Sequence, residues 1–278
     1  MKKTKLFSLA TVAVLSSTIP IGETVLADEE TTGSQAREVE TEGSVGFRAP
    51  EDGEEEIVVN PPEETEPPVT IPPTEPGSTG PLTIAFVPTL NFGERAISNE
   101  DRDYSVLSER QVLVDDDGNP SEETTAYVSF AQVQDTRGNN AGWTLTAHMT
   151  DFVNDGENVK HNVLKGAQVT FKDPSLRYAS DPESAPSIHS NDLVLIPGAG
   201  TALPVMTADT GKGAGVSSVV WGDQTKLNEL EDAAETEEAK KLIENEAIVL
   251  SVPGKTIKDQ GSYISTITWE LTTAVENN

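Results

Sequence analysis

Residues 142–147 read Gly-Trp-Thr-Leu-Thr-Ala, and residues 268–274 read Thr-Trp-Glu-Leu-Thr-Thr-Ala. Both stretches alternate larger apolar side chains with polar ones, the period-two pattern that is typical of β-strands. In the first stretch, Trp143 and Leu145 share one face of the expected strand. We therefore expect two strands that each place a tryptophan and a leucine about 7 Å apart on one face.

The second stretch repeats the arrangement with Trp269 and Leu271, and Tyr263 falls on the same side six residues before the tryptophan. An exposed indole beside an apolar neighbour can stack on a sugar ring, while Thr hydroxyls and Glu270 hydrogen-bond to the ring substituents. Alternatively, both tryptophans pack inside, as Trp in a period-two strand usually does. The residues themselves leave both interpretations open.

Further strand-like runs extend outward from these two stretches. Residues 81–278 hold twelve of the fourteen aromatic residues, so a core must lie there. Short apolar or alternating runs bounded by turn residues favour one all-β domain over 81–278, a sandwich or barrel. The clearest of these runs are residues 82–87, 167–171, 193–196 and 247–252.

Residues 225–246 depart from this pattern. Their apolar residues, among them Leu227 and Leu230, recur at roughly helical spacing, and Glu237 is placed to pair with Lys241. Glu238 interrupts the apolar stripe, so we expect a helical insertion that forms a surface helix with frayed ends.

The N-terminal part reads as an export signal followed by a spacer. Residues 1–27 combine three lysines, a short apolar run and a small residue, Ala27, which predicts a secretory signal peptide cleaved at that point. Residues 28–80 are rich in acids and contain eight prolines. This composition predicts a disordered acidic, Pro-rich stalk, because repulsion and proline both oppose a packed core.

Composition excludes several classes of function. The 278 residues carry a net charge of −28, and cleavage after Ala27 would leave −30. We expect no nucleic-acid partner, because phosphate binding needs clustered Lys and Arg. No cysteine is present, which removes thiolate chemistry. The three histidines lie in separate segments, no hydrolase or phosphate-loop motif is present, and acidic stretches such as 115–119 fit turns better than calcium loops. We therefore expect no enzyme, no cofactor and no metal site.

Short motifs accompany the two tryptophan stretches in a set order. They are Phe86-Val87-Pro88, Asn91-Phe92-Gly93, Asp135-Thr136-Arg137-Gly138, Leu164-Lys165-Gly166-Ala167 and Ser251-Val252-Pro253-Gly254. With the paired Trp-x-Leu motifs, this order resembles the WxL-domain surface proteins of Gram-positive bacteria over nearly all of 81–278. One departure is Val275, where the family usually has proline.

The resemblance implies a secreted, extracellular protein whose C-terminal β domain attaches non-covalently to the cell wall by binding peptidoglycan. It implies wall-binding positions at Trp143 and Leu145 and at Trp269 and Leu271, to which the residues add Tyr263. We see no lipidation cysteine, sortase motif or apolar C-terminal anchor, so we expect no membrane anchor. An alternative is a subunit of a surface complex, with adhesion to another exported protein or to host matrix and indirect wall retention.

Overall fold

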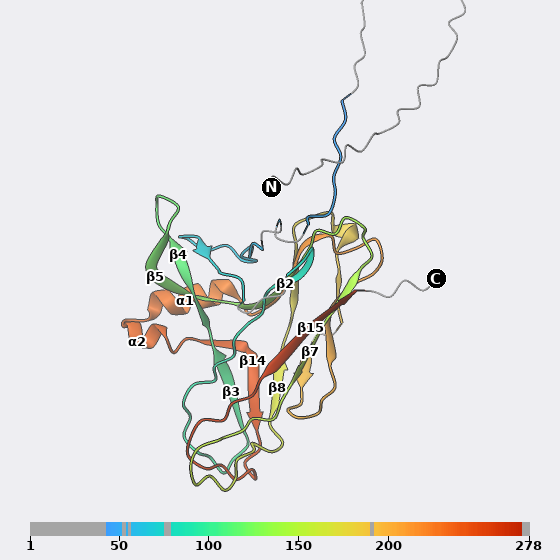
Figure 1. The fold of residues 1–278 in the computed structure, drawn as a ribbon. Helices are drawn as coiled ribbons and strands as arrows, with labels where there is room; N and C mark the ends of the chain where they lie inside the picture. The colour runs from blue at the N-terminus through green and yellow to red at the C-terminus, as the bar shows by residue number, and fades with distance from the viewer. Residues whose placement is uncertain (1–42, 52–53, 55–56, 75–78, 190–191, 274–278) are drawn as a thin grey trace, which may run out of the picture. The chain divides into compact units, whose positions relative to one another are not determined.

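The computed structural model describes residues 43–51, 54, 57–74, 79–189 and 192–273 (Figure 1). Contacts divide the chain into two units, Met1–Val45 and Gly46–Asn278, and every element named below belongs to the second. The expected signal peptide and Val275 lie outside the described residues. Within those residues, no helix has the length and apolar character needed to cross a bilayer.

The described residues form four small antiparallel sheets, and the all-β prediction is confirmed. We call the sheet ordered β10-β12-β7-β15 the tryptophan sheet and the sheet ordered β11-β8-β14-β3 the facing sheet; the other two are ordered β2-β6-β13-β9 and β1-β4-β5. The strands are β1 (Val69–Thr70), β2 (Leu82–Phe86), β3 (Arg102–Leu107), β4 (Glu109–Val114), β5 (Pro120–Tyr127), β6 (Ser129–Asp135), β7 (Trp143–Met149), β8 (Gln168–Phe171), β9 (Ser175–Tyr178), β10 (Ser187–Ile188), β11 (Leu193–Leu195), β12 (Leu203–Ala208), β13 (Gly215–Trp221), β14 (Glu244–Val252) and β15 (Ile267–Thr273).

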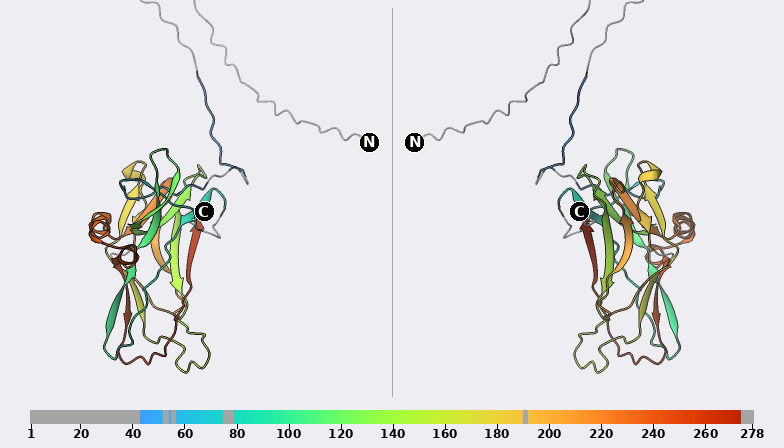
Figure 2. Two further views of the ribbon diagram at one scale, coloured as in Figure 1. Left: turned by 90° about the vertical axis from the view of Figure 1, so that its left-hand side faces the viewer. Right: turned by 90° about the vertical axis from the view of Figure 1, so that its right-hand side faces the viewer.

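The larger core lies between the tryptophan sheet and the facing sheet. Figure 2 shows β3 and β14 on one side of the domain and β7 and β15 on the other. Inward side chains of both sheets join one buried cluster, which also takes residues of β6 and β13. Alternation produces this cluster: along β7 every second residue is fully buried and those between are half-buried. The period-two reading of the sequence thus correctly separates core positions from surface positions.

A smaller core forms around the residues that precede β2. Val59, Val69 and Ile71 are buried together with residues of β5, β6 and β13, and β1 pairs with β4. The sequence predicts an unpacked stalk over 28–80, whereas the structure packs 57–74 onto the β domain. These few apolar residues suffice because the β domain already provides an apolar surface for them to cover.

Polar contacts fix the same segment. The Tyr127 hydroxyl donates to the backbone oxygen of Glu63 at 2.6 Å and accepts from its backbone nitrogen at 2.9 Å. The Gln132 side chain, which is fully buried, exchanges two hydrogen bonds with the backbone of Asn60. Buried side chains with both donor and acceptor satisfied in this way define one position for the segment.

The helical insertion is present but shorter than expected. Helix α1 (Gln224–Ala233) begins at Asp223, whose carboxylate accepts from two backbone nitrogens of the first turn, and α2 (Glu237–Lys240) follows. The expected helical range 225–246 runs too far, because Glu244 already starts β14. Glu237 forms an ion pair with Lys240 at 2.9 Å, whereas the sequence predicted pairing with the next residue, Lys241. Leu227 is buried in the smaller core and Leu230 stays 39% exposed, so α1 is a surface helix with one buried apolar residue.

Candidate functional site

The two Trp-x-Leu motifs lie on neighbouring strands of the tryptophan sheet. Strands β7 and β15 pair in antiparallel register over seven residues without a bulge. Leu145 stands opposite Leu271, Trp269 stands opposite Ala147, and Trp143 stands opposite Thr273. Figure 1 shows β7 and β15 side by side, and their inward side chains join one core cluster although the two motifs are far apart in the sequence.

Trp143 and Leu145 are core residues with no exposed surface. The Trp143 indole Nε1 donates to the backbone oxygen of Gly213 at 3.0 Å, so its one polar atom is satisfied inside the protein. Gly213 has a φ of 75°, and a Cβ at this position would lie 2.7 Å from that same nitrogen. The indole is thus enclosed by the protein, with Gly213 packed against its nitrogen.

Trp269 and Leu271 face the same core but are half-buried, because β15 is the edge strand of the tryptophan sheet. The Trp269 ring lies 6.3 Å from the rings of Phe171 and Trp221. Trp221, which stands outside both motifs, also packs against Phe171 in a tilted arrangement, with the ring centres 4.8 Å apart, and is 1% exposed. Sequence reasoning missed its role; the signal was a third tryptophan at the end of an apolar strand.

The opposite face of this strand pair is polar. The face includes Thr144, Thr268, Glu270 and Thr272, and the last three are exposed. The tryptophans point to the other face, so this structure does not bring an indole and these hydroxyls together; the sequence hypothesis that one sugar ring meets both stays a prediction. Alternation sends tryptophans and threonines to opposite sides of one sheet.

Tyr263, unlike Trp143 and Leu145, is only half-buried and lines a cleft. Its hydroxyl accepts from the backbone nitrogen of Asp259 and donates to the backbone oxygen of His161, both at 2.9 Å. Asp259 in turn accepts from the backbone nitrogens of Lys160 and His161 and contacts the His161 ring at 3.0 Å. These hydrogen bonds lower the pKa of Asp259 to about 2. They tie the loop between β7 and β8 to the loop between β14 and β15.

We call this hollow the loop cleft; its volume is about 780 Å³. Three loops, 87–101, 150–167 and 253–266, meet around it at the lower end of the domain in Figure 1. Its aromatic lining comes from Phe92, Tyr104, Phe152 and Tyr263. Its charged lining residues are Glu94, Arg95, Lys258 and Asp259, two of each sign.

The family model described as WxL domain, surface cell wall-binding, matches residues 34–274. The chain belongs to the WxL family. None of the curated proteins or solved structures compared with the chain matches it. The matched range of the WxL domain includes the segment 57–74 that packs on the smaller core. Membership confirms the resemblance seen in the sequence and places the protein with surface proteins that bind the cell wall.

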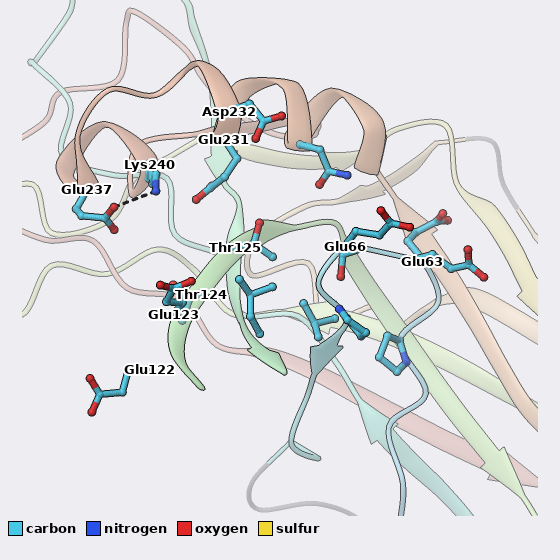
Figure 3. A pocket seen from close by; sticks show the side chains of 17 residues that line it. Glu63, Glu66, Glu122, Glu123, Thr124, Thr125, Glu231, Asp232, Glu237 and Lys240 are labelled. Carbon is cyan, nitrogen blue, oxygen red and sulfur yellow. Dashed lines mark ion pairs between the residues drawn. The ribbon is translucent and has the colours of Figure 1, made fainter. Parts of the chain in front are cut away.

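A second hollow in the WxL domain has a very different charge. The acidic cavity, of about 1260 Å³, lies between α1, β5 and the segment 61–69 (Figure 3). Eight carboxylates line it against one lysine, Lys240, which already pairs with Glu237. The carboxylate of Glu231 also has a partner, because Arg110 donates to both of its oxygens at 2.7 and 2.8 Å. This cavity repels anions.

A third hollow, of about 320 Å³, contains a perturbed carboxyl group. Burial raises the pKa of Glu109 to about 7, although its carboxylate accepts from the backbone nitrogen of Thr89 at 3.0 Å. Its other carboxyl oxygen has no hydrogen-bond partner among the described residues. The stretch 115–119 forms the β4–β5 turn, in which Asp115 accepts from two backbone nitrogens. The described residues contain no group of three or more metal-ligating side chains.

Proposed function

We propose that this protein is exported by its N-terminal signal and attaches non-covalently to the Gram-positive cell wall by binding peptidoglycan through its β domain. The family match to a surface cell wall-binding domain over 34–274 carries this proposal. The in-register pairing of the two Trp-x-Leu motifs agrees with it, because the pairing joins both motifs in one sheet of the matched domain.

We assign different roles to the five wall-binding positions expected from the sequence. Trp143 and Leu145 act by holding the core together, because neither has exposed surface. Trp269 and Leu271 fasten the edge strand to that core. Tyr263 belongs to the loop cleft and joins two of its walls. In this proposal, binding depends on the motifs through the fold and not through contact between indole and sugar.

The charge of the chain constrains how the wall is held. A mature charge of −30 repels the anionic polymers of the wall at long range. Attachment must then come from short-range stacking and hydrogen bonding, or from divalent cations that bridge carboxylates to the wall. No catalytic role is part of the proposal, because the family is defined by wall binding.

Sedimentation with purified walls tests the proposal. The mature protein, mixed with Gram-positive walls that carry no other protein, should pellet with them, and muramidase digestion of the walls should release it. Failure to pellet with clean walls, together with retention on walls that keep their protein complement, would establish the alternative of a surface-complex subunit. Digestion that leaves the protein bound to residual anionic polymer would contradict peptidoglycan as the partner.

A further inference from the structure

We propose that the loop cleft is the site at which the domain binds an uncharged stretch of wall glycan. The inference rests on the proposed function and adds to it the location and chemistry of the contact. Three of the four aromatic rings that line the cleft, those of Phe92, Tyr104 and Tyr263, are half-buried and come from three separate segments of the chain.

The size and lining of the cleft suit a sugar. Its volume of about 780 Å³ lies within the range of roughly 300–1,000 Å³ for small-ligand sites. Sugar rings present apolar faces of C–H groups that pack on aromatic rings, and hydroxyl or acetamido edges that need polar partners. Two further apolar side chains stand near the opening, Ile97 at 59% and Ile264 at 66% exposure. Exposed isoleucines beside aromatic rings form an apolar surface whose burial by a ligand is favourable.

The cleft is already organised before a ligand arrives. Arg95 donates to the backbone oxygen of Phe92 at 2.7 Å, pairs with Glu244 at 2.6 Å, and lies 5.6 Å from the centre of the Tyr104 ring. Lys258 donates to three backbone oxygens at 2.9–3.2 Å. Groups that are held in place lose little conformational entropy on binding, which favours affinity.

Other polar groups in the lining remain open for a ligand. Within the described part of the chain, the side chains of Glu94, Gln260 and Ser262 form no hydrogen bond or ion pair, and all three line the cleft. A carboxylate, an amide and a hydroxyl together can accept from and donate to hydroxyl and acetamido groups. The cleft therefore combines fixed walls with free polar groups, as a sugar site requires.

Charge selects a neutral occupant. The loop cleft carries two positive and two negative lining residues, while the acidic cavity carries eight negative residues and one positive. On a chain of net charge −28, the loop cleft is thus a place where a wall polymer meets no local excess of negative charge. It also has no surplus of cations to attract a phosphate polymer. The sugar backbone of peptidoglycan fits both conditions, because it is uncharged wherever the lactyl carboxyl groups are amide-bonded to the peptides.

Calorimetric titration of the full mature chain with soluble, uncharged glycan fragments, namely short oligomers of N-acetylglucosamine, tests this assignment. We expect saturable binding that is weakened about tenfold or more in Phe92→Ala/Tyr104→Leu, through loss of two ring contacts. Ile264→Arg, a rim substitution at an exposed position, should weaken binding with little effect on stability. Ile257→Ala is the matched control, because Ile257 is 61% exposed and does not line the cleft.

Each result has a defined meaning. If the wild type pellets with walls and Ile264→Arg binds both fragments and walls as well as the wild type does, the proposed role of the loop cleft is wrong. Wall attachment itself would still be supported. Wild-type protein that binds no fragments, or that binds only anionic phosphate polymer, would also overturn the cleft. Wild-type protein that fails to pellet with walls would instead contradict the proposed function. Thermal unfolding of each variant separates lost contact from lost fold.

Discussion

At the scale of single residues, burial places Trp143 in the core. The indole has no exposed surface, and its nitrogen is bonded to Gly213. Removing a buried aromatic ring leaves a cavity that the surrounding strands fill only in part.

Trp143→Ala should therefore lower the free energy of unfolding by about 3–5 kcal/mol. Wall binding should be lost only in step with the loss of folded protein, which urea denaturation followed by tryptophan fluorescence and wall sedimentation under the same conditions can measure. Ile257→Ala, at an exposed position, serves as the control. A Trp143→Ala protein that is folded and stable yet no longer pellets would show that the indole itself contacts the wall.

Glu109 makes stability depend on pH. Burial raises its pKa from 4.5 to about 7. Between pH 4.5 and about 7, the carboxyl group is therefore protonated in the folded state and ionised in the unfolded chain. Its contribution to stability is then greatest below pH 4.5 and declines as pH rises to about 7. Glu109→Gln should flatten this decline and gain up to about 3 kcal/mol relative to the wild type at pH 8.

Urea denaturation of the wild type and Glu109→Gln from pH 4.5 to 8 measures the difference. Glu94→Gln is the matched control, because Glu94 is exposed. Parallel pH profiles for wild type and Glu109→Gln would contradict a raised pKa.

At the scale of elements, the segment 57–74 behaves as part of the β domain. It supplies Val59, Val69 and Ile71 to the smaller core and adds β1 to the sheet of β4 and β5. Composition alone hides this, because acids and prolines surround the few apolar residues that matter. What determines packing is the apolar area that those residues bury.

A chain that starts at Thr79 should be less stable than one that starts at Gly43, by several kcal/mol for three buried apolar side chains. It should also bind a hydrophobic dye, because the smaller core loses its cover. Urea denaturation and dye fluorescence measure both effects. Equal stability of the two chains would mean that packing of the segment 57–74 contributes nothing to the stability of the domain.

At the scale of the whole molecule, the net charge of −28 sets the conditions for wall binding. Long-range repulsion between the protein and anionic wall polymers is screened by salt, whereas stacking and hydrogen bonding are not. Carboxylates on both partners also allow calcium to bridge them.

Binding to purified walls should therefore strengthen when sodium chloride is raised from low to moderate concentration, or when calcium is added. The bound fraction in a sedimentation assay measures this, and sodium chloride compared with calcium chloride at equal ionic strength separates screening from bridging. A steep loss of binding over the same salt range would contradict the short-range mechanism.

Much of the fold could be predicted from local patterns. The strand runs at 82–87, 167–171, 193–196 and 247–252 all recur in the structure, because the period of two reports which face of a strand is buried. Helix boundaries were less well predicted: Asp223 marks the start of α1, but residues 244–246 were assigned to the helix and belong to β14.

The sequence by itself determined the strand character of both Trp-x-Leu motifs, the face on which each tryptophan lies and the WxL resemblance, since these depend on residue order alone. Only the tertiary structure decided that Leu145 meets Leu271, that Trp221 joins Trp269, and that Tyr263 lines a cleft with Tyr104. Local periodicity says which side of a strand is buried. It cannot say which strands pair or which loops meet, because those contacts join residues that are distant along the chain and are set by the packing of the whole core.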